Sequence, residues 1–330
     1  MARTLVTGSA GFIGSWLCEA LRDRGHKVYG ADSCVGGRNS VAGVPLFVGD
    51  LSDNAFARHV AESVQPDVLV HCASDPREGG SWFRLESVTR NNLAAYCSIL
   101  EACLRRGLSK VCVMSSMSVY GDQTPPFTED MSTLPVDPYG VNKAAMEAIT
   151  AQMADAHDFD YVILRPHNVI GPRQFVDPIR NVATIFANQA AHSQPITVFG
   201  DGGQCRAFSN IRDSLPCYIR AIEYDDANGM TFNIGGEEHI TVNTLAETVY
   251  EQFRGAEIVH LPARHGEVRD AYCDHTLAKK WLGFKENHGW IEAVHEICEW
   301  TKQEGPFDWE PVLLATPSDV SPKHWKTKLD

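Results

Sequence analysis

The stretch that predicts the fold is residues 3–14, Arg3-Thr4-Leu5-Val6-Thr7-Gly8-Ser9-Ala10-Gly11-Phe12-Ile13-Gly14. A β-rich run ends at Thr7, and an amphipathic segment follows the glycines as far as Arg24. Strand, glycine loop and helix in this order are the context of a dinucleotide-binding fingerprint. Glycines permit close backbone approach, and a helix N-terminus offers amides and partial positive charge to a pyrophosphate. We therefore expect Gly8, Gly11, Phe12, Ile13 and Gly14 to contact a dinucleotide.

A second strand, residues 27–31, ends at Asp32, eighteen residues after Gly14. A carboxylate at this place would bind the ribose hydroxyls of the adenosine and disfavour a 2′-phosphate. NAD is therefore predicted rather than NADP, with Arg38 as a neighbouring cofactor contact that argues the other way. Alone, each feature could be a turn or a solvated side chain, but their order favours cofactor binding.

The strand and helix pattern then repeats through the first half of the chain. Strands are expected at 46–51, 67–72, 110–114 and 161–165, helices near 53–64, at 92–106 and at 139–156, and a loop over the cofactor at 75–90. This alternation predicts an α/β fold with a Rossmann-like, doubly wound parallel sheet, whose ligands lie at the carboxyl ends of the strands.

Tyr139 and Lys143 form a candidate catalytic pair at the start of the 139–156 helix, directly after Pro138. Positions i and i+4 share a helix face, and a nearby cation favours the phenolate of a tyrosine whose ordinary pKa is about 10. Ser116 follows the 110–114 strand, where a hydroxyl would face the same ligand site. An ordinary amphipathic helix and a serine-rich turn are the alternatives, and the cofactor fingerprint weighs against them.

Composition limits the classes of function. The 330 residues carry a net charge of −13, which argues against binding to nucleic acid or a membrane surface. No apolar run reaches spanning length and no signal peptide is recognised. Six of the ten cysteines fall in helix- or strand-like segments and no Cys-x-x-Cys occurs, which favours reduced thiols in a cytoplasmic protein. The thirteen histidines lack ligand spacing, so we predict no metal site.

The regular alternation ends near residue 168, and a second lobe is expected. We predict a dinucleotide-binding domain at 1–168 plus about 208–236, a smaller α+β substrate lobe at about 169–207 and 237–304, and a C-terminal tail at 305–330. Helices are expected at 181–192, 244–253 and 275–282, and strands at 196–199, 206–211 and 232–235.

The motifs Thr7-Gly8-x-x-Gly11-x-x-Gly14, Asp50-Leu51, Ser116, Tyr120-Gly121 and Tyr139-x-x-x-Lys143 together resemble the extended short-chain dehydrogenase/reductase family. More narrowly, they resemble its nucleotide-sugar epimerases and dehydratases, over roughly residues 1–300. The resemblance implies that Tyr139 is the acid/base, that Lys143 lowers its pKa and holds the nicotinamide ribose, and that Ser116 binds the reacting sugar hydroxyl.

The resemblance also implies contacts beyond the catalytic group. Further cofactor contacts would be Asp50, Leu51, Cys72, Ala73, Ser74, Asn91 and Pro166. Substrate contacts would be Ser118, Asn168, Arg173, Arg206, Arg264 and Ala271. Arg206 and Arg264 resemble the arginines that hold the diphosphate, for which guanidinium groups are suited because they bind its oxygens bidentately. Their alternative is a pair of surface salt bridges.

The residues after Ser116 indicate the reaction. Family dehydratases place Asp-Glu there, and the related decarboxylases usually place a glutamate where Ser118 stands. Met117 and Ser118 cannot supply that proton chemistry. The simplest remaining cycle oxidises a ring hydroxyl, rotates the keto-sugar and returns the hydride to the other face. The expected activity is NAD-dependent epimerisation of a nucleotide-diphosphate sugar, most simply at carbon 4.

The substrate stays open at this point. Ala271 lies where the family often has a tyrosine, so UDP-N-acetylglucosamine is a candidate beside UDP-glucose, unless Ala271 merely packs. Pro166 and His167 depart from the family and admit a deoxy- or heptose sugar or another nucleotide. A keto-sugar reductase and a non-catalytic NAD-sensing scaffold are the alternative functions. A homodimer is expected through the helices at 92–106 and 139–156, whose apolar Ala94, Ala95, Ile99 and Leu100 permit it.

Overall fold

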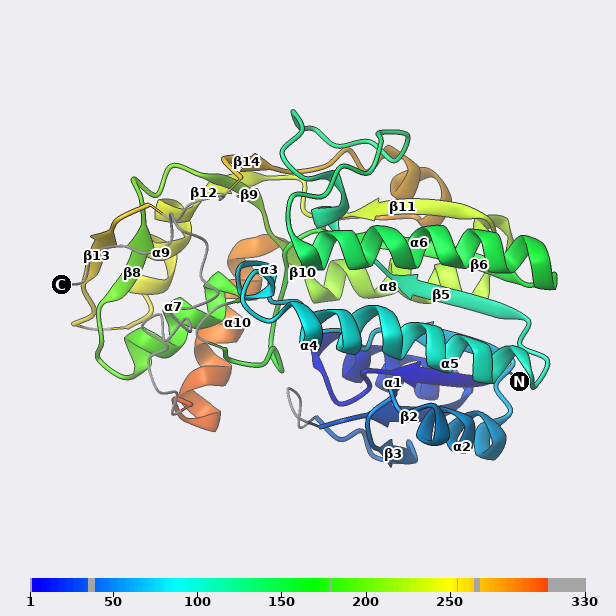
Figure 1. Cartoon of the computed structure of the whole chain (residues 1–330). Coiled ribbons are helices and arrows are strands. Elements are labelled where there is room, and N and C mark those ends of the chain that lie inside the picture. Colours follow the sequence, from blue (N-terminus) through cyan, green and yellow to red (C-terminus); the bar gives the residue numbers. More distant parts are fainter. Residues whose placement is uncertain (1, 35–38, 178–179, 254, 264–267, 308–330) are drawn as a thin grey trace.

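The large sheet has seven strands in the order β11-β6-β5-β4-β1-β2-β3, all parallel (Figure 1). The computed structural model describes residues 2–34, 39–177, 180–253, 255–263 and 268–307. The strands span Arg3–Thr7 (β1), Lys27–Asp32 (β2), Leu46–Val48 (β3), Val68–His71 (β4), Lys110–Met114 (β5), Asp160–Pro166 (β6) and Met230–Ile234 (β11). The strand order reverses direction between β1 and β4, which is where such folds bind dinucleotides. The predicted fold class is confirmed.

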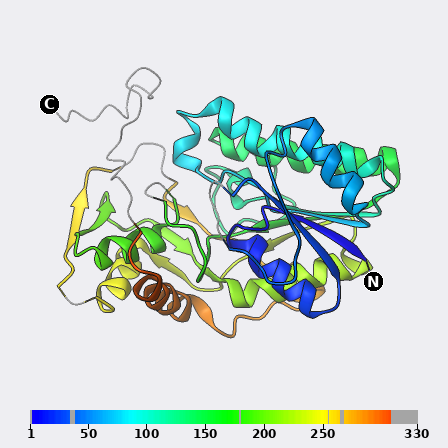
Figure 2. The same cartoon turned by 90° about the horizontal axis from the view of Figure 1, so that it is seen from below.

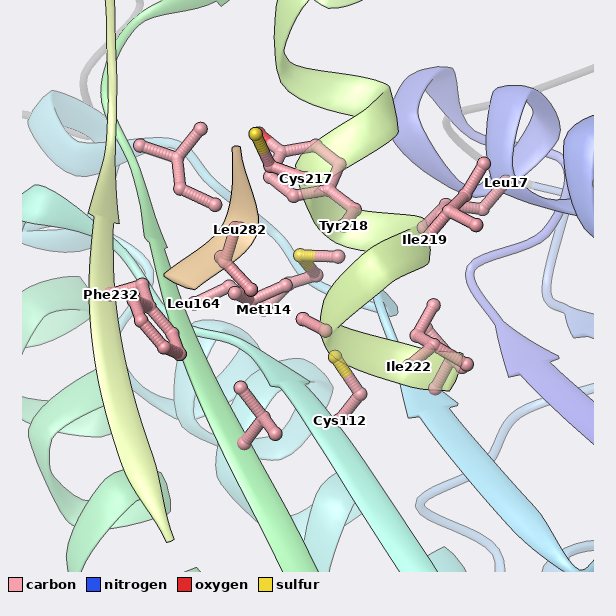
Figure 3. Close-up of a cluster of buried hydrophobic side chains, with 14 of the residues drawn as sticks. Leu17, Cys112, Met114, Leu164, Cys217, Tyr218, Ile219, Ile222, Phe232 and Leu282 are labelled. Carbon is pink, nitrogen blue, oxygen red and sulfur yellow. The ribbon is translucent and has the colours of Figure 1, made fainter. Parts of the chain in front are cut away.

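Helices cover both faces of this sheet, so the central residues of its inner strands are mostly apolar and buried (Figure 2). Helices α1 (Phe12–Asp23) and α8 (Ile211–Glu223) pack on one face, and α2 (Asn54–Val64), α5 (Ala95–Leu104) and α6 (Pro138–His157) pack on the other. Successive residues such as Leu5 and Val6 enter opposite cores because side chains alternate along a strand. Figure 3 shows the first core, with Met114 and Leu164 of the sheet beneath Tyr218 of α8.

A smaller lobe lies at the end of the sheet toward which the strands point (Figure 1). Its core lies among α7 (Val182–Ala191), α9 (Val242–Tyr250) and α10 (Gly289–Glu304), beside the parallel pair β8 (Ile196–Phe199) and β13 (Ile258–Leu261). A second sheet, β12-β9-β14, consists of His239–Thr241, Cys205–Ala207 and Asp270–Ala271. Two short strands, β7 (Val169–Ile170) and β10 (Ser209–Asn210), connect the lobes. This lobe therefore stands beside the carboxyl ends of the large sheet.

Several elements differ from the sequence prediction. The expected loop at 75–90 contains two short helices, α3 (Glu78–Ser81) and α4 (Leu85–Thr89), and a π-helical turn at Arg90–Ala94. Helices α8 and α10 were not predicted. Pro216 lies inside α8, where a proline normally argues against a helix.

The division into two lobes remains a proposal. It is supported by which segments share a sheet or a hydrophobic core, except for one segment. The 275–282 segment was assigned to the smaller lobe, but its π-helical turn, Ala278–Leu282, packs with α8 in the core of the large sheet. Within the described ranges, no helix is long and apolar enough to cross a bilayer.

Candidate functional site

The glycine loop between β1 and α1 leaves no room for side chains. Gly8 has a φ of +67°, and a Cβ on it would lie 2.6 Å from the backbone nitrogen of Ala73. A Cβ on Gly14 would lie 2.1 Å from the carbonyl oxygen of Gly8. Gly11 caps α1 without a side-chain hydrogen bond, so no side chain of the cap covers the first amides of the helix. This arrangement fits a pyrophosphate held by backbone amides at a helix N-terminus.

Asp32 is fixed at the end of β2 beside this loop. Its carboxylate accepts hydrogen bonds from the backbone nitrogens of Ala10, at 2.9 Å, and Cys34, at 2.6 Å. Burial raises the pKa of Asp32, while these backbone hydrogen bonds lower it. The residue thus joins β2 to the glycine loop, a structural role that the sequence did not indicate. Arg38, the predicted cofactor contact nearby, lies outside the described residues.

The segment after β4, which holds Cys72, Ala73 and Ser74, lies directly against the glycine loop. The Ala73 nitrogen donates to Thr7 Oγ1 at 3.2 Å. Farther along the sheet edge, Leu51 is buried in the core, and the exposed Asp50 accepts hydrogen bonds from the backbone and hydroxyl of Ser52.

Asn92, not Asn91, organises this segment. It is fully buried, and its side-chain oxygen accepts from Ser74 Oγ at 2.6 Å and from the Asp75 nitrogen at 3.1 Å. Its amide nitrogen donates to the carbonyls of Val88 and Asp75. Asn91 is only partly buried, and the cofactor contact expected for it stays a prediction. Helical spacing from the fully buried Val88 could have indicated the burial of Asn92, because i and i+4 share a face.

The predicted catalytic pair lies on the buried face of α6. Asp137 caps this helix by accepting from the Gly140 nitrogen, and Pro138 follows in the first turn. Tyr139 is 5% exposed, and Lys143 donates through Nζ to the Met114 carbonyl at 2.7 Å, at the end of β5. The Lys143 ammonium is 5.7 Å from the centre of the Tyr139 ring. The i, i+4 prediction is thus realised geometrically.

The electrostatics of this pair differ from the prediction. Burial raises the pKa of Tyr139, and the Glu78 carboxylate raises it further, whereas hydrogen bonding by the Ser116 and Ser74 hydroxyls lowers it. Burial lowers the pKa of Lys143 to about 8. The lowering of the Tyr139 pKa expected from Lys143 therefore does not prevail among the protein's own groups. The protein's own groups hold the phenol protonated, and a further positive charge is needed to favour the phenolate.

Ser116 begins a short 3-10 helix, Met117–Tyr120, at the end of β5. Its side chain accepts from the Ser118 nitrogen at 3.2 Å, and it is 7% exposed. The Ser118 hydroxyl is buried and has no hydrogen-bond partner among the described residues. A buried hydroxyl without a partner is costly, so a ligand group that bonds it is favoured. The substrate contacts expected of Ser116 and Ser118 stay predictions.

A buried polar network behind this pair was not predicted. Glu147, one turn beyond Lys143 on α6, forms a two-pronged ion pair with Arg165 at 2.9 and 2.6 Å and accepts from Ser115 Oγ. Arg165 also donates to Tyr120 Oη at 2.7 Å, and Tyr120 donates to Asn233 of β11 at 2.7 Å. An arginine ending an otherwise apolar strand was the available signal. The network fixes α6 against β5, β6 and β11.

The predicted substrate residues do not all converge. Asn168 has a φ of +37° and donates to the Ala207 carbonyl at 3.1 Å, so it joins the segment after β6 to β9. Arg206 of β9 pairs with Ala271 of β14 in strand register. Its guanidinium donates to the carbonyls of Cys205, Val268 and Arg269.

Two other predicted substrate residues lie apart from this group or outside the described ranges. Arg173 forms an ion pair with Glu19 at 2.8 Å and stacks on Trp16 at 4.7 Å, so it is held against α1. The structure therefore does not bring Arg173 to the substrate group. Arg264 lies outside the described residues.

Ala271 is 3% exposed and packs with Val119, Tyr120, Phe127 and Cys273. This contact favours the alternative that Ala271 fills a core, rather than opening space for an N-acetyl group. His167, the unusual residue after Pro166, is fully buried, and burial lowers its pKa to about 3. It stands near the rings of Tyr120 and Phe127, so it serves as a neutral packing residue.

A charged cluster joins the two lobes near Tyr139 and was not predicted. Arg77 Nε lies 3.0 Å from Asp75 and 3.4 Å from Asp177, and Arg180 Nε lies 3.8 Å from Asp177. The four side chains are between 8% and 21% exposed. The first two residues follow β4, and the other two precede α7 of the smaller lobe. The ion pairs therefore hold the segment before α3 against the smaller lobe.

Fold and geometry define an NAD-binding α/β protein with a tyrosine and lysine at the carboxyl ends of its sheet. The chain belongs to the NAD dependent epimerase/dehydratase family, whose model matches residues 4–235. NAD is accordingly its cofactor.

Its relatives catalyse more than one reaction. A UDP-glucose 4-epimerase of Mycolicibacterium smegmatis is 30% identical, with 92% of this chain and 99% of the relative covered. A UDP-N-acetyl-alpha-D-glucosaminuronate decarboxylase of Bacillus cytotoxicus is 28% identical over 91% and 98% of the two chains. The crystal structure of a Thermotoga maritima UDP-glucose 4-epimerase with UDP-glucose aligns with a TM-score of 0.86 at 27% identity, covering 91% and 99%.

Proposed function

We propose that this protein is an NAD-dependent nucleotide-sugar 4-epimerase acting on a uridine diphosphate sugar. The observation that carries the proposal is the placement of Ser116, Tyr139 and Lys143 at one edge of the sheet, next to the glycine loop. Met117 and Ser118 stand where a dehydratase or decarboxylase needs acidic groups. Acid/base chemistry on a hydroxyl is therefore available, and the groups for losing water or carbon dioxide are absent from those two positions.

Each residue has a defined part in this proposal. Bound NAD would supply the hydride acceptor and donor together with a positive charge. Tyr139 Oη takes the proton from the sugar hydroxyl, and Ser116 Oγ holds that hydroxyl. Lys143, anchored on the Met114 carbonyl, holds the nicotinamide ribose. Asp32 binds the adenosine ribose, and Arg206 holds the diphosphate.

The raised pKa of Tyr139 explains why the positive charge of the cofactor matters for forming the phenolate. Because the protein's own groups favour the neutral phenol, the phenolate forms readily only when the oxidised cofactor is present. Proton removal is thereby coupled to the state of the cofactor that can accept a hydride. The same coupling returns the proton once the hydride has been transferred back.

The proposal is tested by purifying the protein without added cofactor and identifying the nucleotide that is released on denaturation. The same preparation is incubated with UDP-glucose or UDP-N-acetylglucosamine, and carbon 4 is followed by NMR. Retained NAD with inversion of either sugar is the expected result. Consumption of added NAD(P)H with a keto-sugar, without inversion, would instead identify a reductase. NAD binding without any turnover would identify the scaffold function.

A homodimer and a cytoplasmic location complete the proposal. Ile99 and Leu100 are buried in the core, so they cannot form the interface expected for them. Val141 is an exposed large hydrophobic residue on α6, and Leu134 and Val136 lie exposed just before that helix. We therefore place the dimer contact along α6. All ten cysteines are free, in keeping with a reducing compartment.

A further inference from the structure

Glu78 lies at the start of α3, a helix that packs against the beginning of α6 (Figure 1). Ser81 in the same turn donates to the Glu78 carbonyl at 2.6 Å. The Ser81 hydroxyl also lies near the Asp137 carboxylate, which caps α6, and lowers the pKa of that carboxylate. The turn that carries Glu78 thus packs against the helix that carries Tyr139.

The residue before Glu78 is fixed from the other side. Arg77 pairs with Asp75 at 3.0 Å and with Asp177 of the smaller lobe at 3.4 Å. Glu78 therefore stands on backbone that is anchored in both lobes, at their junction. Such anchoring holds a side chain in one place, which a binding residue requires.

The Glu78 carboxylate acts electrostatically on residues from both lobes. It raises the pKa of Tyr139 on α6, and Arg206 of β9 acts on it in turn. In the proposed function, Tyr139 meets the sugar and Arg206 meets the diphosphate. Because α3 packs against α6 and the neighbouring Arg77 pairs with residues of both lobes, Glu78 stands at the junction where the sugar ring would lie. Glu78 keeps accessible surface although protein atoms surround it, and no hydrogen bond or ion pair engages its carboxylate within the described residues. Its two oxygens are therefore available as acceptors.

We propose that Glu78 is a specificity-determining residue that accepts hydrogen bonds from hydroxyls of a neutral sugar and excludes sugars that carry their own carboxylate. The proposal rests on the proposed function and narrows its substrate class to neutral hexoses. An ionised carboxylate is only an acceptor, so it matches sugar hydroxyls and repels a uronate. Repulsion of the wrong ligand is an effective source of specificity.

The charge on Glu78 makes the exclusion depend on pH. Burial, and then Asp137, raise the pKa of Glu78 to about 7, while Arg206 lowers it. The other charged groups nearby are paired with each other, Arg77 with Asp75 and Arg180 with Asp177. Above pH 7 the carboxylate is ionised and repels a uronate. Below pH 7 it becomes protonated, and the exclusion weakens.

The experiment compares UDP-glucose with UDP-glucuronate, because both carry the same nucleotide and differ in the charge at carbon 6. The ratio of their kcat/KM values is measured from pH 6 to 9 for the wild type, Glu78→Gln and Glu78→Asp. The ratio cancels the ionisation of Tyr139, which affects both substrates. Glu86→Gln is the matched control, since it removes the same charge from an exposed position on the neighbouring helix α4.

At pH 8 the wild type is expected to prefer UDP-glucose, and Glu78→Gln is expected to reduce that preference about tenfold, as one close charge repulsion implies. The wild-type preference should shrink below pH 7, while Glu78→Gln should give a flat profile. Glu78→Asp should keep the preference, and Glu86→Gln should match the wild type. An unchanged ratio in Glu78→Gln, or a wild type that prefers the uronate at pH 8, overturns the proposal.

Binding separates this inference from the proposed function. The affinities of both nucleotide sugars are measured by calorimetry in the Tyr139→Phe background, where turnover is blocked. If no sugar is inverted but UDP-glucose still binds more tightly and Glu78→Gln removes the difference, the epimerase proposal fails and the role of Glu78 stands. Failure to bind either nucleotide sugar contradicts both.

Discussion

At the scale of single residues, the site combines groups whose protonation the fold controls. Tyr139 and Lys143 are both buried, and burial moves their pKa values in opposite directions, each toward the neutral form. The sequence could predict the pair, because an i, i+4 spacing is local. It could not predict the direction of the pKa of Tyr139, because Glu78 and the burial come from segments distant in the chain.

Replacing Tyr139 with phenylalanine tests the base. Tyr139→Phe should fold normally and keep its affinity for NAD, yet lose about 10²- to 10⁴-fold in kcat, the usual contribution of a positioned proton carrier. Steady-state kinetics with a cofactor-binding assay on the same preparation provide the check. Near wild-type turnover in this variant would remove Tyr139 from the proposed role.

Asp32 should determine the choice between NAD and NADP. Asp32→Asn keeps the size of the side chain and one acceptor oxygen, but it removes the charge that repels a 2′-phosphate. The variant should bind NAD more weakly, and its affinity for NADP relative to NAD should rise about tenfold or more. Titration with both cofactors measures the ratio, and an unchanged preference would show that Asp32 only supports the glycine loop.

Two buried histidines should make the protein sensitive to acid. Burial lowers the pKa of His71 and of His167 to about 3, below the ordinary value of 6.5. Below pH 6.5 these two histidines become protonated in the unfolded chain but stay neutral in the folded chain. The free energy of unfolding therefore falls as the pH falls toward 3. The loss is about 1.4 kcal/mol per pH unit for each histidine.

Urea unfolding of His167→Gln between pH 7 and 5 should therefore show a shallower loss of stability than the wild type. The exposed His59 provides the control, because His59→Gln should leave the slope unchanged. A slope that His167→Gln does not alter would mean that this ring is protonated equally in both states.

At the scale of elements, the glycine loop and α6 differ in how far the sequence determined them. The loop between β1 and α1 was predicted fully, since three glycines, a strand and a helix lie within a short stretch. Helix α6 was predicted in extent, but its anchoring by the Glu147–Arg165 ion pair was not, because the partners come from different elements. The short helices α3 and α4 were taken for a loop, since the polar, glycine-bearing 75–90 segment lacks a helical pattern.

The glycine loop should tolerate no side chain at its close contact. Gly14→Ala would place a methyl group 2.1 Å from the Gly8 carbonyl, so the loop must shift and NAD affinity should fall by at least about tenfold. Gly25→Ala is the control: it has a φ of +88° but open space around it. It should cost only about 1 kcal/mol of stability and leave NAD binding intact. Equal NAD affinities in the two variants would contradict the proposal that the glycine loop holds the pyrophosphate of NAD.

The buried ion pair behind the site should be essential to stability. Glu147 and Arg165 are 9% and 5% exposed, so Glu147→Ala leaves a buried guanidinium without its carboxylate. The free energy of unfolding should fall by about 3–5 kcal/mol. The exposed pair Glu101–Arg105 gives the comparison, because Glu101→Ala should leave the free energy of unfolding nearly unchanged. Denaturant titration of both variants measures the two changes in the free energy of unfolding. Similar losses in the two variants would contradict a stabilising role for the buried network.

At the scale of the whole molecule, two lobes meet at the carboxyl ends of the sheet, and the candidate site is assembled from both. The large lobe contributes the cofactor loop, Ser116, Tyr139 and Lys143, and the smaller lobe contributes Arg206 and Asp177. The sequence predicted the fold of the large lobe because its alternation is regular. It predicted the smaller lobe less well, since short strands such as β9 and β14 pair across 65 residues and leave no local periodic pattern.

The measurement to make is the fate of the hydrogen at carbon 4. The protein is incubated with UDP-glucose carrying deuterium at that carbon, in the presence of unlabelled NADH, and the product is examined by NMR. Transient oxidation with a retained cofactor predicts inverted sugar that keeps its deuterium at carbon 4. Loss of the deuterium to the NADH pool or to solvent, or product without inversion, would contradict the proposed epimerase.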